Sequence, residues 1–417
     1  MHRVYLACGT ALAYLVLAGL SALLAYSQAD AWTVWFANGV TLGLLLALRR
    51  SLWPAVLAGV FVAALVFELF IGSSLPDAIG YALIELVTAL LGAWLASLIA
   101  RLPLRLESPR ELAATLAGAL LLALTGALIA TAWSAWSHTD PVRQVFHVWF
   151  TSNLVGALLT TPLIVSWLQF RAKRSGGLPA PAFIVGAVGA VLFIGGLMLV
   201  FATGGGRGLK GEFAYLPVLF LALVALMWGT RGATLVALLG ALLATACTVA
   251  GRGPFVDEIA LPGDGVLEVQ VYATAMALTG LLIAVLSAAQ RRALNAARDW
   301  QTRFEAAIGA HRLLAYEWDP RSGRLSITGD AQALLGVAPQ SLRSLADWLA
   351  LVRGDDRDRV NARFELRAQG DGSSDTLDYD LARRDGTALT ISDESRAIRD
   401  HDGTLHRIVG IVRAVAA

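Results

Sequence analysis

The stretch from Trp35 to Phe70, WFANGVTLGLLLALRRSLWPAVLAGVFVAALVFELF, predicts how the larger part of the chain folds. Two apolar segments flank the pair Arg49-Arg50, and Trp53-Pro54 opens the second of them. Apolar segments separated by short basic corners are typical of membrane helices, because a crossing needs about 20 apolar residues and arginine stays at its ends. The stretch therefore predicts a pair of membrane-spanning helices.

The composition extends this interpretation to the whole chain. Of its 417 residues, 57% are hydrophobic and 15% are charged, whereas soluble domains have about 45–50% apolar and roughly 25% charged residues. Lys173 and Lys210 are the only lysines, which argues against a nucleic-acid-binding surface. Cys8 and Cys247 both fall in apolar segments, so we expect no disulfide framework and no metal site.

Ten apolar segments are candidate membrane spans, and the first reads as a retained span instead of a cleaved signal peptide. They are Val4–Tyr26, Val34–Leu48, Trp53–Ile71, Ala78–Ala100, Leu112–Trp133, Val145–Leu168, Phe183–Phe201, Phe213–Trp228, Ala233–Ala250 and Val266–Ala289. The second and eighth are the weakest, and an eight-span arrangement that omits two segments is the alternative.

Basic residues alternate between the loops in the way the positive-inside rule requires. With the N-terminus in the cytoplasm, twelve lie inside: Arg3, Arg49, Arg50, Arg101, Arg105, Arg110, Arg171, Lys173, Arg174, Arg231, Arg291 and Arg292. Four lie outside: Arg143, Arg207, Lys210 and Arg252. The pattern predicts a multi-pass membrane protein with both termini in the cytoplasm.

Five polar residues fall at one depth in these spans, toward the outer side: Asn38, Glu68, Glu85, His147 and Asn153. Ionisable groups at such depth are costly unless they pair or face a cavity. We therefore hypothesise an outward-facing pocket, with Glu85 as the strongest candidate, rimmed by four tryptophans: Trp35, Trp133, Trp136 and Trp149. The alternative is that these groups act as interhelical contacts or lie at the headgroups.

After Ala289 the sequence becomes polar. Residues 290–310 have apolar side chains at helical spacing, including Leu294, Trp300 and Phe304, and are expected to form a signalling helix. From His311 to Ala417 a small soluble domain is expected. Its predicted strands are His311–Trp318, Arg324–Thr328, Asp375–Arg383, Ala388–Arg399 and Leu405–Val415, and its predicted helices are Asp330–Leu335, Leu342–Leu351 and Asp355–Gln369.

This last domain resembles a PAS domain. The resemblance is carried by Tyr316-Glu-Trp-Asp319, Ala333-Leu-Leu-Gly336, Gly354-Asp-Asp-Arg357, Arg383-Arg-Asp-Gly-Thr387 and the tail from His401 to Val412. It implies an α+β fold with a five-stranded antiparallel sheet. A flavin–cysteinyl photosensor would need a cysteine here, and the long helix has no histidine for haem, so we expect no cofactor and leave a PAS ligand open.

The preceding region, 1–289, resembles the type-one membrane-associated sensor (MASE) family of bacterial signalling proteins. The matching pieces are Asn38-Gly39 with Trp53-Pro54, Glu85 before Leu91-Gly-Ala-Trp-Leu95, Asn153-Leu-Val-Gly156 with Thr161-Pro162, Arg231-Gly-Ala233 and Gly253-Pro-Phe255. The resemblance implies a polytopic helical sensor module embedded in the lipid bilayer. It also implies dimerisation and an output through a partner or downstream histidine kinase, diguanylate cyclase or phosphodiesterase.

Catalytic signatures of such effectors are missing from the sequence, which has no Gly-Gly-Asp-Glu-Phe, Glu-Ala-Leu, phosphate-loop or His-Glu-x-x-His motif. We therefore expect a non-enzymatic sensor. Two alternatives stay open: the input region of a kinase or cyclase, and a transporter regulated by its PAS-like domain.

Overall fold

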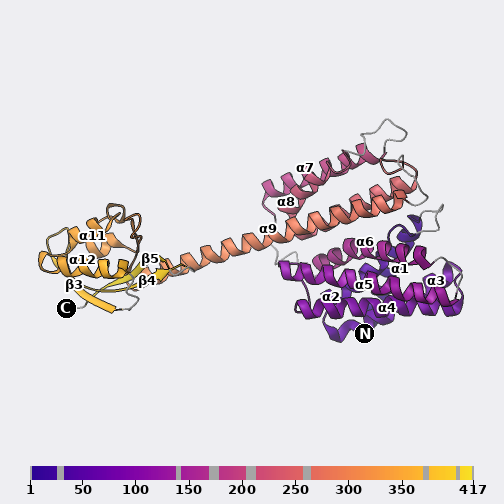
Figure 1. Cartoon of the computed structure of the whole chain (residues 1–417), viewed down its shortest axis with the longest axis horizontal. Coiled ribbons are helices and arrows are strands. Elements are labelled where there is room, and N and C mark those ends of the chain that lie inside the picture. Colours follow the sequence, from indigo (N-terminus) through magenta and orange to yellow (C-terminus); the bar gives the residue numbers. More distant parts are fainter. Residues whose placement is uncertain are drawn as a thin grey trace. The chain divides into compact units, whose positions relative to one another are not determined.

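The structure is a computed structural model that describes residues 2–25, 32–137, 142–168, 178–202, 213–256, 264–369, 375–400 and 404–415. The chain divides into two compact units, Met1–Arg292 and Ala293–Ala417 (Figure 1). Several residues used above lie outside the described ones: Arg171, Lys173, Arg174, Arg207, Lys210 and residues 401–403 of the last hairpin.

The first unit is a bundle of apolar helices. Among the described residues, eight are long and apolar enough to cross a membrane. The helices of this unit are α1 (His2–Leu23), α2 (Phe36–Ala47), α3 (Trp53–Phe70), α4 (Leu75–Ile99), α5 (Pro109–Ser137), α6 (Val142–Leu168), α7 (Ala180–Leu197), α8 (Val218–Val249) and α9 (Asp264–Ala310), which continues into the second unit. A short π-helix, Met198–Ala202, follows α7.

Helix α2 is shorter than the predicted span Val34–Leu48. Its twelve residues rise about 18 Å, well short of the roughly 30 Å hydrocarbon core. All of them are buried, and Gly39 lies against Gly156 and Thr160 of α6. Since Cβ atoms at Gly39 or Gly156 would clash with facing backbone, glycine is what permits this close approach. Thus α2 is a buried helix of the bundle core and not a full-length span.

Helix α8 is two antiparallel arms joined at Gly229, whose φ is 66° and ψ is −157°. The first arm runs antiparallel to α7, because Gly186 lies against Trp228 while Gly196 lies against Pro217. The second arm runs parallel to α7, from Gly229 toward Gly253, which lies against Phe201. The segments Phe213–Trp228 and Ala233–Ala250 are therefore separate, as predicted. With these arms and α2 counted, the ten predicted apolar segments are all present as helices.

The described arginines of the predicted inner loops gather at one end of the bundle, which we call the arginine end. Here Arg292 pairs with Glu107 (3.2 Å), and Arg231 Nε donates to Ser166 O (3.2 Å). The Leu104 N–H donates to Leu46 O (2.8 Å), which brings the loop after α4 beside the end of α2 and the Arg49-Arg50 corner. This segregation is what the charge pattern of a membrane protein requires.

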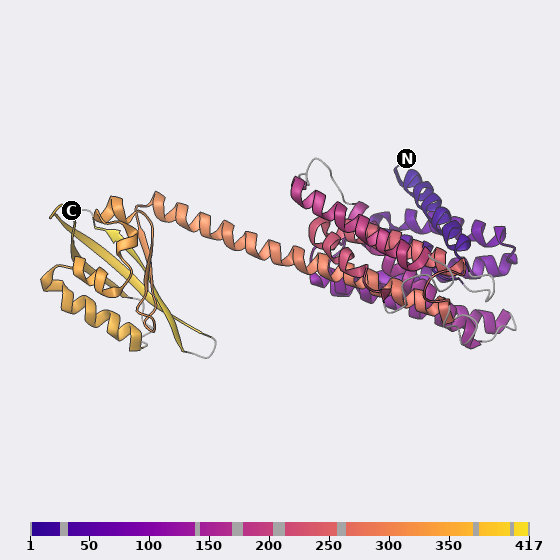
Figure 2. The same ribbon diagram turned by 90° about the horizontal axis from the view of Figure 1, so that it is seen from above.

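The second unit contains a five-stranded antiparallel sheet in the order β2-β1-β5-β4-β3. Figure 2 shows its long strands in yellow beside orange helices of the same unit. Its elements are β1 (Leu314–Trp318), β2 (Leu325–Thr328), α10 (Ala331–Leu335), α11 (Leu345–Leu351), α12 (Gly354–Gln369), β3 (Asp375–Ala382), β4 (Ala388–Arg399) and β5 (Leu405–Ala414). Each predicted strand is confirmed within a few residues. The helices cover one sheet face, where Trp348 and Phe364 pack on Tyr316 and Trp318.

Candidate functional site

A cavity of about 210 Å³ lies in the first unit, at the end of the bundle away from the arginine end. Its position follows from α3, which starts after Arg50 and reaches the cavity with its last turn and Ser73. The lining residues are Tyr14, Trp32, Trp35, Ala64, Glu68, Ile71, Ser73, Tyr81, Glu85, Val148, Trp149, Ser152 and Asn153. Three of the five predicted pocket residues, Glu68, Glu85 and Asn153, therefore line one cavity.

Glu85 is the most deeply buried charged group of this cavity, with 6% of its surface exposed. Trp35 Nε1 donates a 2.7 Å hydrogen bond to its Oε1. Its Oε2 is buried and has no hydrogen-bond partner among the described residues. Glu68 is half-buried and accepts from the Ser73 hydroxyl (2.7 Å). Both carboxylates thus belong to the cavity, but only Glu85 retains an unsatisfied buried oxygen.

Asn38 does not line the cavity but is hydrogen-bonded to the lining residue Asn153. It is completely buried, and its Nδ2 donates to Oδ1 (2.6 Å) and to the backbone O (3.1 Å) of Asn153. Asn153 Nδ2 in turn donates to Trp149 O (2.7 Å). The paired amides lock α2 to α6 and fix the side of α6 that faces the cavity.

Three residues predicted to line or rim the pocket, His147, Trp133 and Trp136, lie outside the cavity lining. His147 is exposed and is not among the lining residues. Trp133 and Trp136 also lie outside the lining; they pack on each other at 5.3 Å, and Trp133 Nε1 donates to Asp77 (3.2 Å). Of the four tryptophans expected at the rim, Trp35 and Trp149 line the cavity. His147 precedes Val148 by one residue and Trp149 by two, so it points away from the side of α6 on which those two residues line the cavity.

Three aromatic lining residues were missed by the sequence reasoning: Tyr14, Trp32 and Tyr81. Trp32 and Trp35 pack edge to face with ring centroids 5.1 Å apart, and Tyr81 stacks on Trp149 at 5.6 Å. Tyr14 is a tyrosine in the interior of an apolar helix, which was the available signal. Nothing in the sequence brings Tyr81 and Trp149 together, since that contact depends on how α4 and α6 each pack against α2 and α5.

The cavity wall is connected to α9, the helix that continues into the second unit. Gln270 of α9 is buried, and its Nε2 donates to Thr33 O (2.7 Å), between the lining residues Trp32 and Trp35. On the other side, the Trp35 N–H donates to Ser152 O (3.0 Å). The segment from Trp32 to Trp35 is therefore hydrogen-bonded to both α6 and α9.

The interior of the second unit contains a polar cluster that the sequence analysis did not identify. Asp393 of β4 is 1% exposed and accepts from Tyr316 Oη (3.1 Å) and Tyr379 Oη (3.0 Å). Trp348 Nε1 donates to Tyr379 Oη (3.0 Å), and Arg363 Nη2 lies 3.4 Å from Ser395 Oγ. Burial raises the pKa of the Asp393 carboxyl above its usual range, and the nearby Arg363 guanidinium partly offsets the rise.

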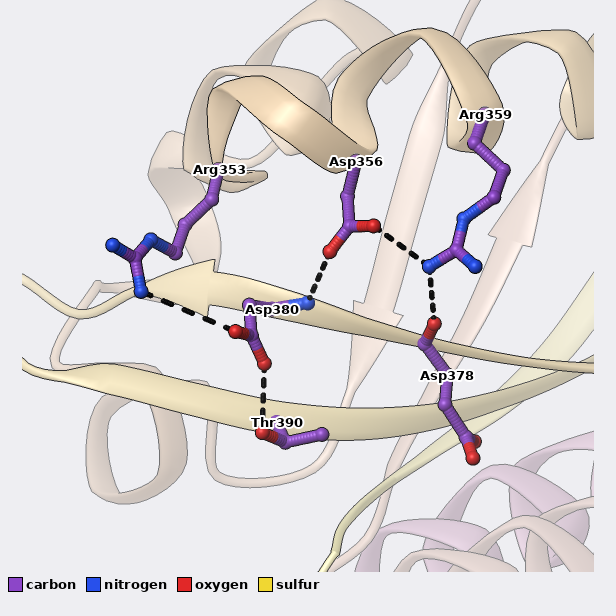
Figure 3. Close-up of polar contacts among 6 residues, drawn as sticks. All are labelled: Arg353, Asp356, Arg359, Asp378, Asp380 and Thr390. Atoms are coloured by element: carbon purple, nitrogen blue, oxygen red, sulfur yellow. Dashed lines mark hydrogen bonds and ion pairs between the residues drawn. The ribbon is translucent and has the colours of Figure 1, made fainter.

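The start of α12 is fixed to the sheet by the Asp356 carboxylate (Figure 3). Asp356 accepts from the Asp380 N–H of β3 (3.0 Å) and from Arg359 (2.7 Å), while Arg359 also donates to Asp378 O (2.7 Å). Arg353 lies 4.0 Å from the Asp380 carboxylate, which accepts from the Thr390 hydroxyl (2.7 Å). These contacts at the Gly354–Arg357 motif range from partly buried to exposed and hold the start of α12 on β3.

The predicted relay residues lie on the last turns of α9. Trp300 stacks on Phe304 (5.4 Å), and both line a hollow of about 600 Å³ over the sheet face opposite α12, with residues such as Glu317 and Ile411. Leu294 is 52% exposed, and every residue from Gln290 to Arg303 is exposed. This part of α9 has an open surface in the single chain.

Comparison with protein-family models matches residues 4–292 to MASE1 and residues 324–412 to the PAS fold. A comparison with curated proteins found none that matches the chain. The two family matches confirm the predicted order of a MASE domain followed by a PAS domain, and they support a multi-pass membrane protein that serves as a sensory input module.

Solved structures similar to the chain align with about a quarter of it. One is the N-terminal domain of a diguanylate cyclase with PAS/PAC sensor from Marinobacter aquaeolei, at 23% identity, covering 24% of this chain and 94% of that one, TM-score 0.23. Another is a sensory box histidine kinase/response regulator from Burkholderia thailandensis, at 20% identity, covering 27% and 84%, TM-score 0.23. A third is a PAS domain from Colwellia psychrerythraea, at 14% identity, covering 28% and 96%, TM-score 0.24.

Proposed function

The chain belongs to the MASE1 family, and from this premise we propose that it is a bacterial inner-membrane sensor that detects a stimulus in the cavity of its first unit. The arginine end faces the cytoplasm in this proposal, as the positive-inside rule favours, so the cavity opens toward the periplasm. Residues 1–289 act as the sensor, 290–310 as the relay and 311–417 as the cytoplasmic PAS domain.

One observation supports the proposal most directly: the cavity wall at Thr33 is hydrogen-bonded to Gln270 of α9. A stimulus can shift a conformational equilibrium only by interacting differently with its two states. A molecule in the cavity contacts Trp32 and Trp35, which lie on either side of Thr33. It therefore acts on the position of α9 through the buried hydrogen bond between Gln270 and Thr33. Because α9 is one continuous helix to Ala310, a rotation or sliding at Gln270 reaches the PAS unit.

Output in this proposal requires another protein or domain. The family models matched by the chain are MASE1 and the PAS fold, neither of which supplies a kinase, cyclase or phosphodiesterase reaction here. We therefore propose a non-catalytic input module that acts as a homodimer on a partner kinase or cyclase, with the exposed surface of α9 from Gln290 to Arg303 as the contact between copies.

Hydrogen–deuterium exchange on the full chain in lipid nanodiscs tests the relay. Trp149→Ala opens the cavity and is expected to change the exchange rates of the 290–310 amides. Trp136→Ala, which removes an exposed tryptophan outside the lining, is the matched control and is expected to leave them unchanged. The double variant Trp149→Ala/Gln270→Ala should behave like Gln270→Ala alone, because the two residues act in series.

Independent, additive effects of the two substitutions would contradict a relay through Gln270. Flux measurements in liposomes address the transporter alternative: a sensor predicts no cavity-dependent flux, whereas solute transport lost in Trp149→Ala would replace the sensor assignment.

A further inference from the structure

The chemistry of the cavity wall points to the class of stimulus. We propose that the cavity binds a small organic cation, a quaternary or protonated ammonium group; this deepens the proposed function, on whose sensory cavity it rests. The first argument is charge. Glu68 and Glu85 line the cavity, and no lysine, arginine or histidine is among its described lining residues, so an anion would be repelled at a depth where screening is weak.

The second argument is the unsatisfied oxygen of Glu85. Burial of a carboxylate oxygen without a partner costs free energy, and Trp35 satisfies only Oε1. A neutral apolar ligand would leave this cost in place. A cation in the cavity compensates the buried charge, and the pair becomes neutral in the low-dielectric interior.

The third argument is the aromatic wall. Five aromatic residues line the cavity: Tyr14, Trp32, Trp35, Tyr81 and Trp149. Tryptophan and tyrosine faces attract cations within about 6 Å of the ring centroid, and quaternary ammonium groups are recognised by cages of this kind. The ring pairs Trp32–Trp35 and Tyr81–Trp149 come from different elements of the fold, so the wall surrounds the cavity from more than one side.

An organic cation also fits better than a metal ion. Calcium takes 6–8 oxygen ligands and magnesium a near-ideal octahedral set, whereas the lining offers two carboxylates, two serine hydroxyls, two tyrosine hydroxyls and the amide of Asn153. Both serine hydroxyls and the Asn153 amide are already hydrogen-bonded within the chain. In the described part of the chain no group of three or more His, Cys, Asp or Glu side chains could hold a metal. At about 210 Å³ the cavity is smaller than the roughly 300–1,000 Å³ of pockets for drug-sized ligands, which suits an ammonium headgroup.

Titration calorimetry on the full chain in nanodiscs separates charge from shape. The probes are choline and 3,3-dimethylbutan-1-ol, its neutral carbon isostere, at matched ionic strength. We expect choline to bind at least about tenfold more tightly than the isostere, a difference of about 1.4 kcal/mol. Equal affinity for the two probes, or no choline binding up to about 100 mM, overturns the proposal.

Variants locate the binding. Glu85→Gln and Trp149→Ala are each expected to weaken choline binding at least about tenfold, whereas Trp136→Ala retains it. Glu68→Gln, at a half-buried position, provides a second charge variant if Glu85→Gln does not fold. If a folded Glu85→Gln or Glu68→Gln variant binds choline as tightly as the unmodified chain, the binding is adventitious and the proposed cation site is refuted.

The binding result is independent of the relay result. Choline binding that leaves exchange of the 290–310 amides unchanged would retain the ligand class and refute the sensor mechanism. A working relay between Trp149 and Gln270 in a protein that does not bind choline would refute the ligand class alone.

Discussion

At the scale of single residues, Asp393 links the stability of the PAS unit to pH. Its carboxyl has a raised pKa in the folded protein because it is buried. An acid whose folded-state pKa is raised stabilises the fold below its unfolded-state pKa, and this contribution is lost as pH rises through the folded-state value. Asp393→Asn stays neutral, so we expect its stability relative to the unmodified chain to increase as pH rises.

Exchange of β4 and β5 amides in the full chain, followed from about pH 3 to pH 8 (allowing for the intrinsic pH dependence of exchange), measures this difference. Asp319→Asn is a control of opposite sign, because bonds from Ser322 and the Arg321 N–H lower the pKa of exposed Asp319. That variant should lose stability relative to the unmodified chain as pH rises. A pH-independent difference for Asp393→Asn would show that the carboxyl does not titrate as its burial implies.

A comparison of Glu85 with Asp393 shows which buried polar residues a sequence can identify. Glu85 could be found because an acidic residue inside a long apolar helix conflicts with its surroundings. Asp393 could not be found as readily, because strand β4 carries polar residues on both faces, and only the register with β3 and β5 shows which ones turn inward. Ile391, Asp393 and Ser395 occur at every second position and so share one face of β4, which was the one available signal.

At the scale of secondary-structure elements, the reversal of α8 depends on Gly229. Its φ of 66° with ψ of −157° lies in a region that is essentially restricted to glycine. Gly229→Ala should therefore destabilise the first unit by about 1–3 kcal/mol. Gly126→Ala in α5, where an added Cβ meets only Thr88 at 3.9 Å, is the control and should be neutral or slightly stabilising. Thermal unfolding in nanodiscs compares the two; equal midpoints would contradict a strained turn.

The helices of the first unit were predictable from hydropathy wherever an apolar segment is long and is bounded by polar residues. The α7 and α9 spans follow from their apolar residues, and the arms of α8 follow from the Arg231-Gly232 break between them. The second segment was predicted to be one of the two weakest spans, but the ends of α2 were not predictable, because Trp35 and Leu48 are as apolar as the helix they flank. Its ends are set by tertiary contacts, namely the Trp35 N–H bond to Ser152 and the Leu104 bond to Leu46.

At the scale of the whole molecule, a relay along α9 depends on helical phase. Each residue inserted into a helix rotates everything after it by about 100° and moves it by about 1.5 Å. The stretch from Gln290 to Arg303 is exposed, so insertions there disturb no packed core within the chain. A relay that reaches the PAS unit predicts that Trp149→Ala also changes amide exchange there, and one alanine inserted after Asn295 should abolish that effect. Seven alanines, close to two full turns, should preserve it.

The two insertions distinguish the mechanisms by which a helix can carry a signal. A rotating helix presents a new face after one residue and nearly the original face after seven. A sliding helix transmits axial displacement at any phase, so both insertions would leave the response intact. Loss of the response in both variants would show that the relay depends on the native length of α9. This result is expected if the apolar side chains of Leu294 and Trp300 must contact fixed partners in a second copy of the chain.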